Sequence, residues 1–411
     1  MTEPVSLFFA FRFRDYRLFQ IARVLSVVAA AMISVAVGWH MYALTGRALD
    51  LGYVGLAQFL PFMALSAAGG HTADRFDRRA VFLFTLVGQA FCALALWALT
   101  RTPQADTRPL YAVLVILGAV RAFAGPPQAA LTPRLVPKEA LVNAITLSQG
   151  LFQVALVLGP ALGGVLYGIT HEAASVFGVA ALMLLLAFVF VFAIRTRTGR
   201  SDDEDASWSS VLAGFRFVWK NTLLLGCFSL DLFAVLLGGT VALLPIFARD
   251  VLSVGPEGLG LLRAAPAIGA ALVAIGLARF PLEKRVGRKM LVSVALFGVF
   301  TVVFGLSASF PLSFLALVIL GAADMVSVVV RSTIEQLATP EAMRGRVGAV
   351  NQIFVGASNE LGAFRAGLTA QAWGAIPSVV WGGIAAVLIV AAWAFFFPVL
   401  RRVNRLSDIQ A

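Results

Sequence analysis

Apolar runs of about 20 residues recur along the whole of this 411-residue chain, and they constrain its fold more than any other feature. A helix of that length crosses a hydrocarbon core of roughly 30 Å. The twelve runs lie at 17–44, 51–73, 80–100, 109–131, 140–168, 173–195, 222–248, 257–280, 289–308, 311–335, 346–372 and 377–399. Because 60% of the residues are hydrophobic, 13% are charged and period-two alternation is absent, neither a soluble domain nor an outer-membrane barrel fits. We predict an all-α membrane protein with twelve transmembrane helices.

The basic residues are distributed unequally between the two sides of the membrane. With a cytoplasmic N-terminus, 23 of the 32 Lys and Arg residues fall in inner connections and 4 in outer ones. This asymmetry follows the positive-inside rule, so we predict a multi-pass protein of the bacterial cytoplasmic (inner) membrane with both termini in the cytoplasm. The net charge of +11 is spread between the apolar runs rather than gathered on one module, which argues against nucleic acid as a partner.

The longest polar segment, RTRTGRSDDEDASWSSVLAGFRFVWKN, separates the sixth apolar run from the seventh. It divides the chain into an N-terminal six-helix bundle at 1–195, a cytoplasmic linker at 196–221 and a C-terminal six-helix bundle at 222–411. Apolar residues recur at helical spacing from Trp208 to Trp219. This pattern is typical of an amphipathic helix in the membrane interface, and a simple extension of the seventh run would show it equally.

Two stretches 203 residues apart resemble each other. Aligning LVPKEALVNAITLSQGLFQVALVLGPALGG (135–164) with ATPEAMRGRVGAVNQIFVGASNELGAFRAG (338–367) pairs Pro137 with Pro340, Gln149 with Gln352, Gly159 with Gly362 and Gly164 with Gly367. The same offset pairs Gly118 with Gly321. Matches at corresponding connections indicate a duplicated six-helix unit.

The short connection GGHTADRFDRRAV (69–81) concentrates charges of both signs between the second and third runs. It resembles the signature loop of the major facilitator superfamily at Gly70, Asp74, Arg75, Arg78 and Arg79, with Asp77 where glycine is usual. GAVRAFAGPPQ (118–128) resembles the superfamily's fourth-helix motif, and LGPALGG (158–164) resembles its exporter-associated fifth-helix motif. Stretches at 44–61, 228–260 and 344–352 resemble the branch that contains the enterobactin exporter and macrolide-efflux proteins.

This resemblance implies a secondary transporter built from two pseudo-symmetric six-helix bundles that rock about a central cavity. In that fold, Asp74 with Arg75 and Arg78 would form a cytoplasmic gate that closes the inner side. The alternative for the arginines is a set of membrane-surface anchors. Kinship at the level of the fold does not fix the substrate.

The fifth-helix motif contains Gly159, Pro160, Gly163 and Gly164. Small residues four apart let helix backbones approach closely, and proline removes one helical hydrogen bond. We predict a flexing contact between the two halves at these residues. Each glycine taken alone fits simple packing equally well.

Charged residues inside the apolar runs are costly, by about 2.5–3.5 kcal/mol on insertion scales, so each should face a partner or a water-filled cavity. Arg121, by the superfamily's fourth-helix motif, and Asp231, which has no basic residue within a helical turn, are the first candidates for proton coupling. Asp324 and Glu360 are the next. Arg331 and Glu335 have the i, i+4 spacing of an ion pair near the cytoplasmic end, which favours a place in the gate.

We therefore predict a secondary active transporter, not an enzyme, that exports an amphipathic siderophore or drug-like molecule by alternating access in exchange for protons. Its partners would be that substrate, protons and the lipid bilayer, and we expect a monomer without cofactor or metal. Arg23, Trp39, Gln149 and Gln153 are candidates for the substrate cavity. A lysolipid transporter or a facilitator is the alternative. A membrane enzyme or a receptor is disfavoured, because the chain lacks HExxH, GxSxG and GxxxxGK[ST] motifs and a long polar output domain.

Overall fold

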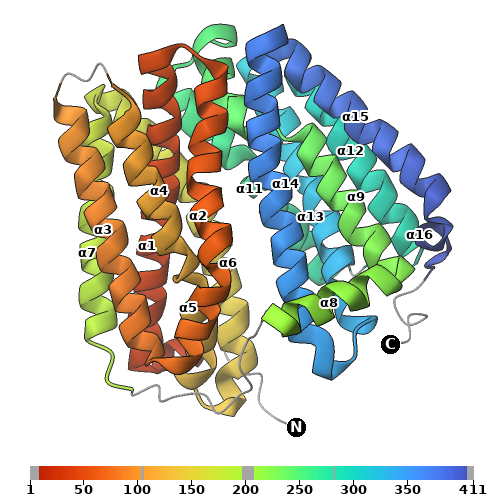
Figure 1. Cartoon of the computed structure of the whole chain (residues 1–411), viewed down its shortest axis with the longest axis horizontal. Coiled ribbons are helices and arrows are strands. Elements are labelled where there is room, and N and C mark those ends of the chain that lie inside the picture. Colours follow the sequence, from red (N-terminus) through yellow and green to blue (C-terminus); the bar gives the residue numbers. More distant parts are fainter. Residues whose placement is uncertain (1–8, 103–105, 197–207, 281, 283, 405–411) are drawn as a thin grey trace. The chain divides into compact units, whose positions relative to one another are not determined.

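The computed structural model describes residues 9–102, 106–196, 208–280, 282 and 284–404, and the regular structure of these residues is helical (Figure 1). The helices are α1 (Arg14–Thr45), α2 (Ala48–Arg75), α3 (Arg78–Arg101), α4 (Arg108–Ala122), α5 (Gly125–Leu131), α6 (Leu141–Thr170), α7 (Ala173–Phe192), α8 (Trp208–Lys220), α9 (Thr222–Gly238), α10 (Leu244–Ile246), α11 (Gly255–Arg279), α12 (Val286–Leu306), α13 (Phe310–Leu337), α14 (Arg344–Trp373), α15 (Ala375–Phe396) and α16 (Pro398–Arg402). Between them lie the 3₁₀ turns η1 (Phe9–Arg12), η2 (Thr132–Arg134), η3 (Lys138–Ala140), η4 (Val241–Leu243) and η6 (Glu341–Met343) and the π-helix η5 (Phe247–Val251).

The twelve predicted transmembrane helices are consistent with this architecture. Within the described residues, 11 helical stretches are long and apolar enough to cross a membrane, and each coincides with a predicted run. The remaining run, 346–372, forms α14, whose 30 residues are long enough to span but include polar groups such as Asn351, Glu360 and Arg365. The chain is an all-α, multi-pass membrane protein.

The described residues form two compact units, and their boundary does not coincide with the middle of the sequence. The first unit comprises the described residues of Met1–His40 and Leu60–Ala206, and the second those of Met41–Phe59 and Ser207–Ala411. The end of α1 and the first part of α2 therefore pack with the helices that follow the linker. This places residues from both halves of the sequence in one compact unit.

In the first unit, α3 packs against α7 and α4, and polar groups fix the helix ends. Asp77 caps α3 by accepting a hydrogen bond from the Ala80 N–H at 3.0 Å. Arg79 donates from Nε to the carbonyl of Val191 at 3.1 Å and from Nη2 to that of Phe192. Both carbonyls belong to the last turn of α7, where they lack partners within the helix, so Arg79 caps α7.

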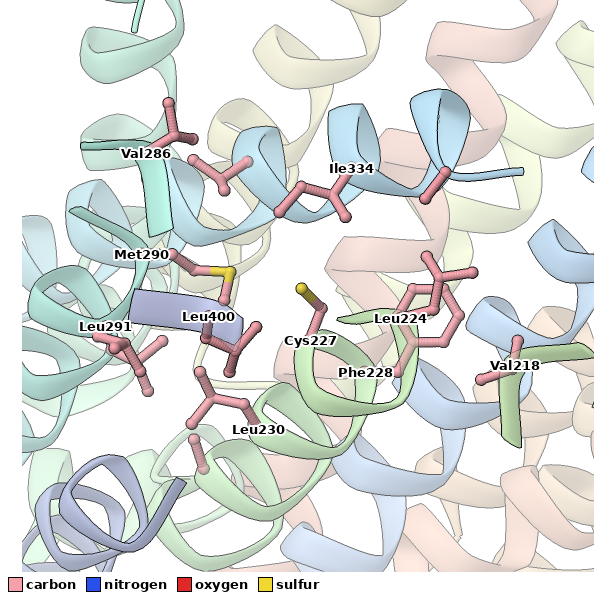
Figure 2. Close-up of a cluster of buried hydrophobic side chains, with 14 of the residues drawn as sticks. Val218, Leu224, Cys227, Phe228, Leu230, Val286, Met290, Leu291, Ile334 and Leu400 are labelled. Atoms are coloured by element: carbon pink, nitrogen blue, oxygen red, sulfur yellow. The ribbon is translucent and has the colours of Figure 1, made fainter. Parts of the chain in front are cut away.

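In the second unit, α11 packs on α13, α12 on α13 and α15, and α9 on α14 and α15. At one end of this bundle, buried side chains from α8, α9, α12, α13 and α16 converge in a hydrophobic cluster (Figure 2). The labelled members are Val218, Leu224, Cys227, Phe228, Leu230, Val286, Met290, Leu291, Ile334 and Leu400. Because lipid tails are as apolar as these side chains, close packing rather than transfer out of water stabilises such contacts within the membrane.

The amphipathic segment forms a separate helix, α8, rather than an extension of the seventh run. Asn221 has extended backbone angles, φ −93° and ψ 100°, which interrupt the helix after Lys220. Its side chain then accepts hydrogen bonds from the N–H groups of Leu223 and Leu224 at 3.1 and 3.2 Å and caps α9. Gly214 of α8 lies directly against the Arg346 backbone of α14, so α8 is held on the second unit.

Candidate functional site

A buried ion pair joins two helices inside the second unit. Arg331 of α13 pairs with Asp231 of α9, and their side chains are 6% and 8% exposed. Arg331 is six residues from the end of α13 and Asp231 nine residues from the start of α9, which places them about 9 Å and about 14 Å along their helices. Apolar neighbours on the same helices, Leu230 and Val330, are 1% exposed, so the pair lies in a medium of low polarity.

Asp324 adds a second carboxylate to this pair. It lies two turns before Arg331 on α13, is only partly buried, and interacts electrostatically with both Asp231 and Arg331. It is 13 residues from the end of α13, so it lies about 20 Å along the helix, near the middle of a bilayer. We name Asp231, Asp324 and Arg331 the charge cluster.

Glu335 extends the charge cluster toward the end of α13. Its Oε2 accepts a hydrogen bond from Asn351 Nδ2 of α14 at 2.8 Å, and its carboxylate interacts electrostatically with Arg331. Asp324, Arg331 and Glu335 are spaced by seven and four residues, so they share one face of α13. Titratable groups therefore line this face from mid-membrane to the end of the helix.

The structure changes two of our predictions about the charge cluster. Asp231 does have a basic partner, because Arg331 reaches it from another helix, whereas sequence spacing showed only neighbours on α9. Arg331 pairs with Asp231 rather than with Glu335, although Glu335 has the favourable i, i+4 spacing. The direction of each side chain depends on which helix packs alongside, and the spacing within α13 carries no information about that.

Glu360 of α14 lies close to two other helices of the second unit. It interacts electrostatically with Arg263 of α11, and a Cβ on Gly55 of α2 would lie 2.8 Å from its Oε2. Glu360 is half-buried. The carboxylate thus lies between an arginine and the backbone of α2.

Two glycines allow α2 and α14 to pack closely at this point. A Cβ on Gly367 would lie 2.9 Å from the Ala48 carbonyl oxygen and 3.0 Å from the Gly52 nitrogen. A Cβ on Gly52 would lie 3.1 Å from the Phe364 Cα. Real side chains rarely approach backbone atoms this closely, so the contact requires glycine on both helices. We name the contact of Gly52 and Gly55 with Ala363, Phe364 and Gly367 the α2–α14 seam.

A polar contact joins the end of α1 to the π-helix in the same unit. The Tyr42 hydroxyl donates to Asp250 Oδ2, and Arg249 Nη1 donates to the Tyr42 carbonyl at 3.3 Å. The Arg249 guanidinium also lies over the Tyr42 ring, 5.5 Å from its centroid. Helix α9 ends at Gly238, and the chain continues through η4 and α10 into η5, so Arg249 and Asp250 lie on an irregular helix, where functional sites often occur.

The side chain that stabilises the end of α9 is Arg365. Its Nε donates to the Leu236 carbonyl at 3.1 Å, one of the carbonyls left without a partner in the last turn. This intramembrane arginine has a structural role: it satisfies the broken end of a membrane helix.

Tyr42→Phe should loosen the contact between α1 and η5. Asp250 is 47% exposed, so water weakens the hydrogen bond that is lost, and we expect a cost of about 1 kcal/mol. Hydrogen–deuterium exchange of residues 247–254 should become about fivefold faster, since 1.4 kcal/mol corresponds to a factor of ten. Tyr53→Phe is the matched control, because its ring rather than its hydroxyl makes the described contact with Phe364. Equal exchange in the wild type and Tyr42→Phe would contradict a stabilising role for this hydroxyl.

The signature loop lies at the junction of α2 and α3. Asp74 and Arg75 form the last turn of α2, and the Asp74 side chain lies outside the described part of the structure. Arg75 is exposed, whereas Arg78, at the start of α3, is 7% exposed. The unusual Asp77 has a local function, the capping of α3. The gate formed by Asp74, Arg75 and Arg78 stays a prediction.

The glycines of the fifth-helix motif contact α1, in the same unit. A Cβ on Gly159 would lie 3.1 Å from the Val28 carbonyl, and one on Gly163 would lie 2.9 Å from the Met32 Cα. Pro160 and Gly164 are buried in the same continuous helix, α6. The described contacts of Gly159 and Gly163 lie within the first unit, and the flexing contact between the two halves at this motif stays a prediction. The glycines of the α2–α14 seam join residues from the two halves of the sequence within the second unit.

The predicted cavity residues of the first unit fall into separate places. The Arg23 guanidinium lies over the Phe152 ring, 5.5 Å from its centroid, and Phe152 belongs to α6, the helix that carries Gln149 and Gln153. Gln149 is exposed and Gln153 half-buried. Trp39 packs edge-on against Tyr167, and its 16-residue separation from Arg23 corresponds to about 24 Å along α1. Trp39 therefore does not join the Arg23 group.

Arg121 lies in the last turn of α4, next to a break in the helix. The Ala124 N–H donates to the Arg121 carbonyl at 3.1 Å before the chain enters α5 at Gly125. The Arg121 side chain is exposed within the described structure. An exposed arginine at membrane depth is expected to face a polar cavity.

The sequence model of the Major Facilitator Superfamily matches residues 20–363, most of the chain. The chain belongs to this superfamily. Enterobactin exporters EntS from Citrobacter koseri and Escherichia coli are 28% identical to it over 341 and 343 residues, covering 82% of this chain and 80% of each relative. The family and these relatives identify the chain as a transporter.

Solved transporters share the superfamily fold. A POT family transporter in complex with 5-aminolevulinic acid has a TM-score of 0.75 at 12% identity, covering 94% of this chain and 96% of that one. A bacterial homolog of the human lysosomal transporter Spinster, inward-facing and unoccupied, has a TM-score of 0.73 at 17% identity, covering 97% and 99%. The nucleoside transporter NupG has a TM-score of 0.74 at 15% identity, covering 93% and 99%.

Packing within each unit repeats in the way that a duplicated superfamily chain predicts. Gly159 of α6 packs against α1, and its partner at the 203-residue offset, Gly362 of α14, packs against Val235 and Leu236 of α9. Each is a glycine on the fifth helix of its half that contacts the first helix of that half. The alignment of the two halves identified both glycines, but it could not show that they contact α1 and α9.

Proposed function

We propose that this superfamily member exports an amphipathic small molecule, of the siderophore or drug type, by alternating access with proton antiport. The charge cluster carries the proposal. The named function of the EntS relatives, enterobactin export, supports the substrate class. The positive-inside pattern supports a place in the cytoplasmic membrane with both termini in the cytoplasm.

The composition of the charge cluster favours a single exchangeable proton. Two carboxylates and one guanidinium carry a net charge of −1 when all are ionised, and protonation of one carboxylate makes the cluster neutral. Net charge in a medium of low polarity is unfavourable, so the neutral form is stabilised there. Asp231 is occupied by Arg331, whereas Asp324 is partly exposed and lies near mid-membrane. We therefore assign the proton to Asp324 rather than to Asp231, our first candidate from the sequence.

The residues around the charge cluster suggest how that proton moves. Glu335 lies on the same face of α13, between the charge cluster and the end of the helix that the charge pattern assigns to the cytoplasm. Protons bound at Asp324 would leave along this face. Glu360, which interacts with Arg263, is a further candidate proton carrier in the second unit. In the first unit, Arg121 is the basic residue that we assign to proton coupling.

The α2–α14 seam is the outer closure in this proposal. The charge pattern assigns the connection between α1 and α2 to the outer side, and this connection lies at one end of the seam. When α2 leaves α14, Glu360 loses the cover of the Gly55 backbone and meets outer water. Asp74 with Arg75 and Arg78 would close the inner side in turn.

The test is proton release by purified protein when a catecholate siderophore or a macrolide is added, combined with transport into proteoliposomes at several pH values. Wild-type protein should release protons on binding, and its transport should depend on the proton gradient. Asp324→Asn should bind substrate without releasing protons, and its transport should lose its pH dependence. Glu341→Gln is the matched control, because Glu341 is 89% exposed and pairs with Arg344 at the surface.

Each outcome of this test decides one part of the proposal. Wild-type binding without proton release would make the protein a facilitator or couple it to another ion. Normal proton release by Asp324→Asn would exclude Asp324 as the proton carrier and return Asp231 and Glu360 to consideration. Transport of a lysolipid with no response to siderophore or macrolide would replace the substrate class.

A further inference from the structure

A pocket of about 630 Å³ lies beside α8, outside the regions that the proposed transport mechanism uses. It is lined by Leu212, Ala213, Arg216, Phe217, Lys220 and Met343, and we name it the α8 pocket. Its volume falls within the range of roughly 300–1,000 Å³ typical of small-ligand sites.

The α8 pocket combines one apolar part with two cations. Leu212, Arg216 and Lys220 follow one another at intervals of four residues, so they form a single stripe along α8, and all three are exposed. Ala213 and Phe217 form the adjacent stripe and are half-buried. The opposite face of α8 is occupied, because Gly214 and Val218 pack against the second unit.

Both described charged residues that line the pocket, Arg216 and Lys220, are positive. Met343 also lines the pocket. The Met343 sulfur accepts a hydrogen bond from Arg346 Nη1 at 3.7 Å. The nearby Glu341 is engaged by Arg344 at 3.6 Å. Among the described residues, Glu341 is thus paired with Arg344, and Arg216 and Lys220 can contact an anion from outside the protein.

We propose that the α8 pocket binds an anionic phospholipid, with the phosphate on Arg216 and Lys220 and an acyl chain along Leu212, Phe217 and Met343. Phosphate is the anion that arginine and lysine recognise best at a membrane surface. Free phosphate would leave the apolar wall unused, whereas a phospholipid supplies both chemistries in one molecule. Trp219, 68% exposed on the same helix, is of the type that lies at headgroup level.

This site would fix the position of the linker helix relative to the bilayer. Helix α8 packs on α14, which carries Glu360 and one side of the α2–α14 seam. Binding of a lipid at α8 is independent of the transported substrate and goes beyond the proposed function.

The test is native mass spectrometry of the full-length protein in detergent with phosphatidylglycerol and with phosphatidylcholine of the same acyl chains. Wild-type protein should bind phosphatidylglycerol more tightly than phosphatidylcholine. Arg216→Gln/Lys220→Gln should weaken phosphatidylglycerol binding by about tenfold or more, because each basic residue near a membrane contributes a similar part of the attraction to an anionic headgroup. Arg401→Gln/Arg402→Gln is the matched control, since it removes the same charge from exposed positions of α16 and should change binding less than about twofold.

Two further arms separate a lipid from a free anion. Leu212→Asn should weaken phosphatidylglycerol binding while Arg216 and Lys220 are kept, and inorganic phosphate should not displace the lipid. Equal binding of both lipids, unchanged binding by Arg216→Gln/Lys220→Gln, or displacement by inorganic phosphate would each overturn the proposal. Size-exclusion profiles and melting temperatures equal to the wild type establish that the variants are folded.

Discussion

Arg331→Ala should lower the free energy of unfolding by about 3–5 kcal/mol, because it leaves the Asp231 carboxylate buried without its partner. Asp324 is nearby, so the variant leaves two carboxylates in one region of low polarity. Their mutual repulsion adds to the loss of the pair. The destabilisation should become smaller as the pH falls, because protonation neutralises the carboxylates.

Removing the other partner of the ion pair should cost less. Asp231→Asn leaves Arg331 with Asp324, whose charge can still compensate the guanidinium. The double variant Asp231→Asn/Arg331→Met removes both partners of the ion pair and leaves Asp324 as the single carboxylate of the charge cluster, so it should be more stable than Arg331→Ala. The predicted order of stability is therefore wild type, then Asp231→Asn and the double variant, then Arg331→Ala.

Reversible unfolding in mixed micelles with increasing SDS measures this order. Arg344→Ala is the surface control, since Arg344 and Glu341 are 52% and 89% exposed and their pair should contribute less than about 1 kcal/mol. If Arg331→Ala and Arg344→Ala were equally stable, the charge cluster would not be isolated from water, and the single-proton argument would lose its physical basis.

The membrane helices could be predicted from the sequence because each must satisfy its own backbone hydrogen bonds within the bilayer. Length and apolar composition are local properties, so the runs at 17–44 and 311–335 correspond to α1 and α13 within a few residues. Even α14, with its polar residues, was found, since its apolar positions continue for the length of a membrane span. The break between α9 and η5 was missed, because the apolar run continues through it.

The candidate site was predicted only in part, because its contacts join residues far apart in the chain. The sequence singled out Asp231, Asp324 and Arg331 as costly intramembrane charges, but it could not show that Arg331 pairs with Asp231, 100 residues away. Helical periodicity tells which residues share a face and not which helix that face meets.

The α2–α14 seam was missed for the same reason, although its small residues were visible. Ala363 and Gly367 are four apart, as in other close helix contacts, and Gly52 and Gly55 stand near the start of α2. The same pattern in α6 led us to predict a flexing contact between the halves at Gly159, Pro160, Gly163 and Gly164, and the described contacts of Gly159 and Gly163 are with α1. Small residues predict close packing, but the partner helix follows only from the three-dimensional structure.

Gly367→Ala should shift the protein away from the conformation in which α2 and α14 touch. Replacing glycine by alanine normally stabilises a helix interior by about 0.5–1 kcal/mol, but here the new Cβ would meet backbone atoms of Ala48 and Gly52 that cannot rotate aside. Overpacking of this kind costs about 1–3 kcal/mol, which changes the ratio of the two conformations by roughly fivefold to a hundredfold. In the proposed cycle of alternating access the protein passes through the closed seam, so we expect transport to fall by a similar factor.

The measurement is the distance between spin labels at Arg47→Cys and Trp373→Cys, in a background with Cys92→Ala and Cys227→Ala. Both label positions are exposed and lie near the same end of the α2–α14 seam. Gly367→Ala should increase the population with the longer distance. Gly52→Ala should do so less strongly, because its Cβ would lie 3.1 Å rather than 2.9 Å from its nearest backbone atom.

Gly345→Ala is the matched control on the same helix, since a Cβ there would meet no atom within 4 Å. It should leave both the distances and transport unchanged. If Gly367→Ala lost transport without a change in the distances, the seam would affect another step of the cycle. If Gly367→Ala kept wild-type transport and wild-type distances, the close approach of α2 and α14 would be a packing contact alone. The outer closure of the proposed cycle would then have to lie at Tyr42 and Asp250, where α1 meets the π-helix.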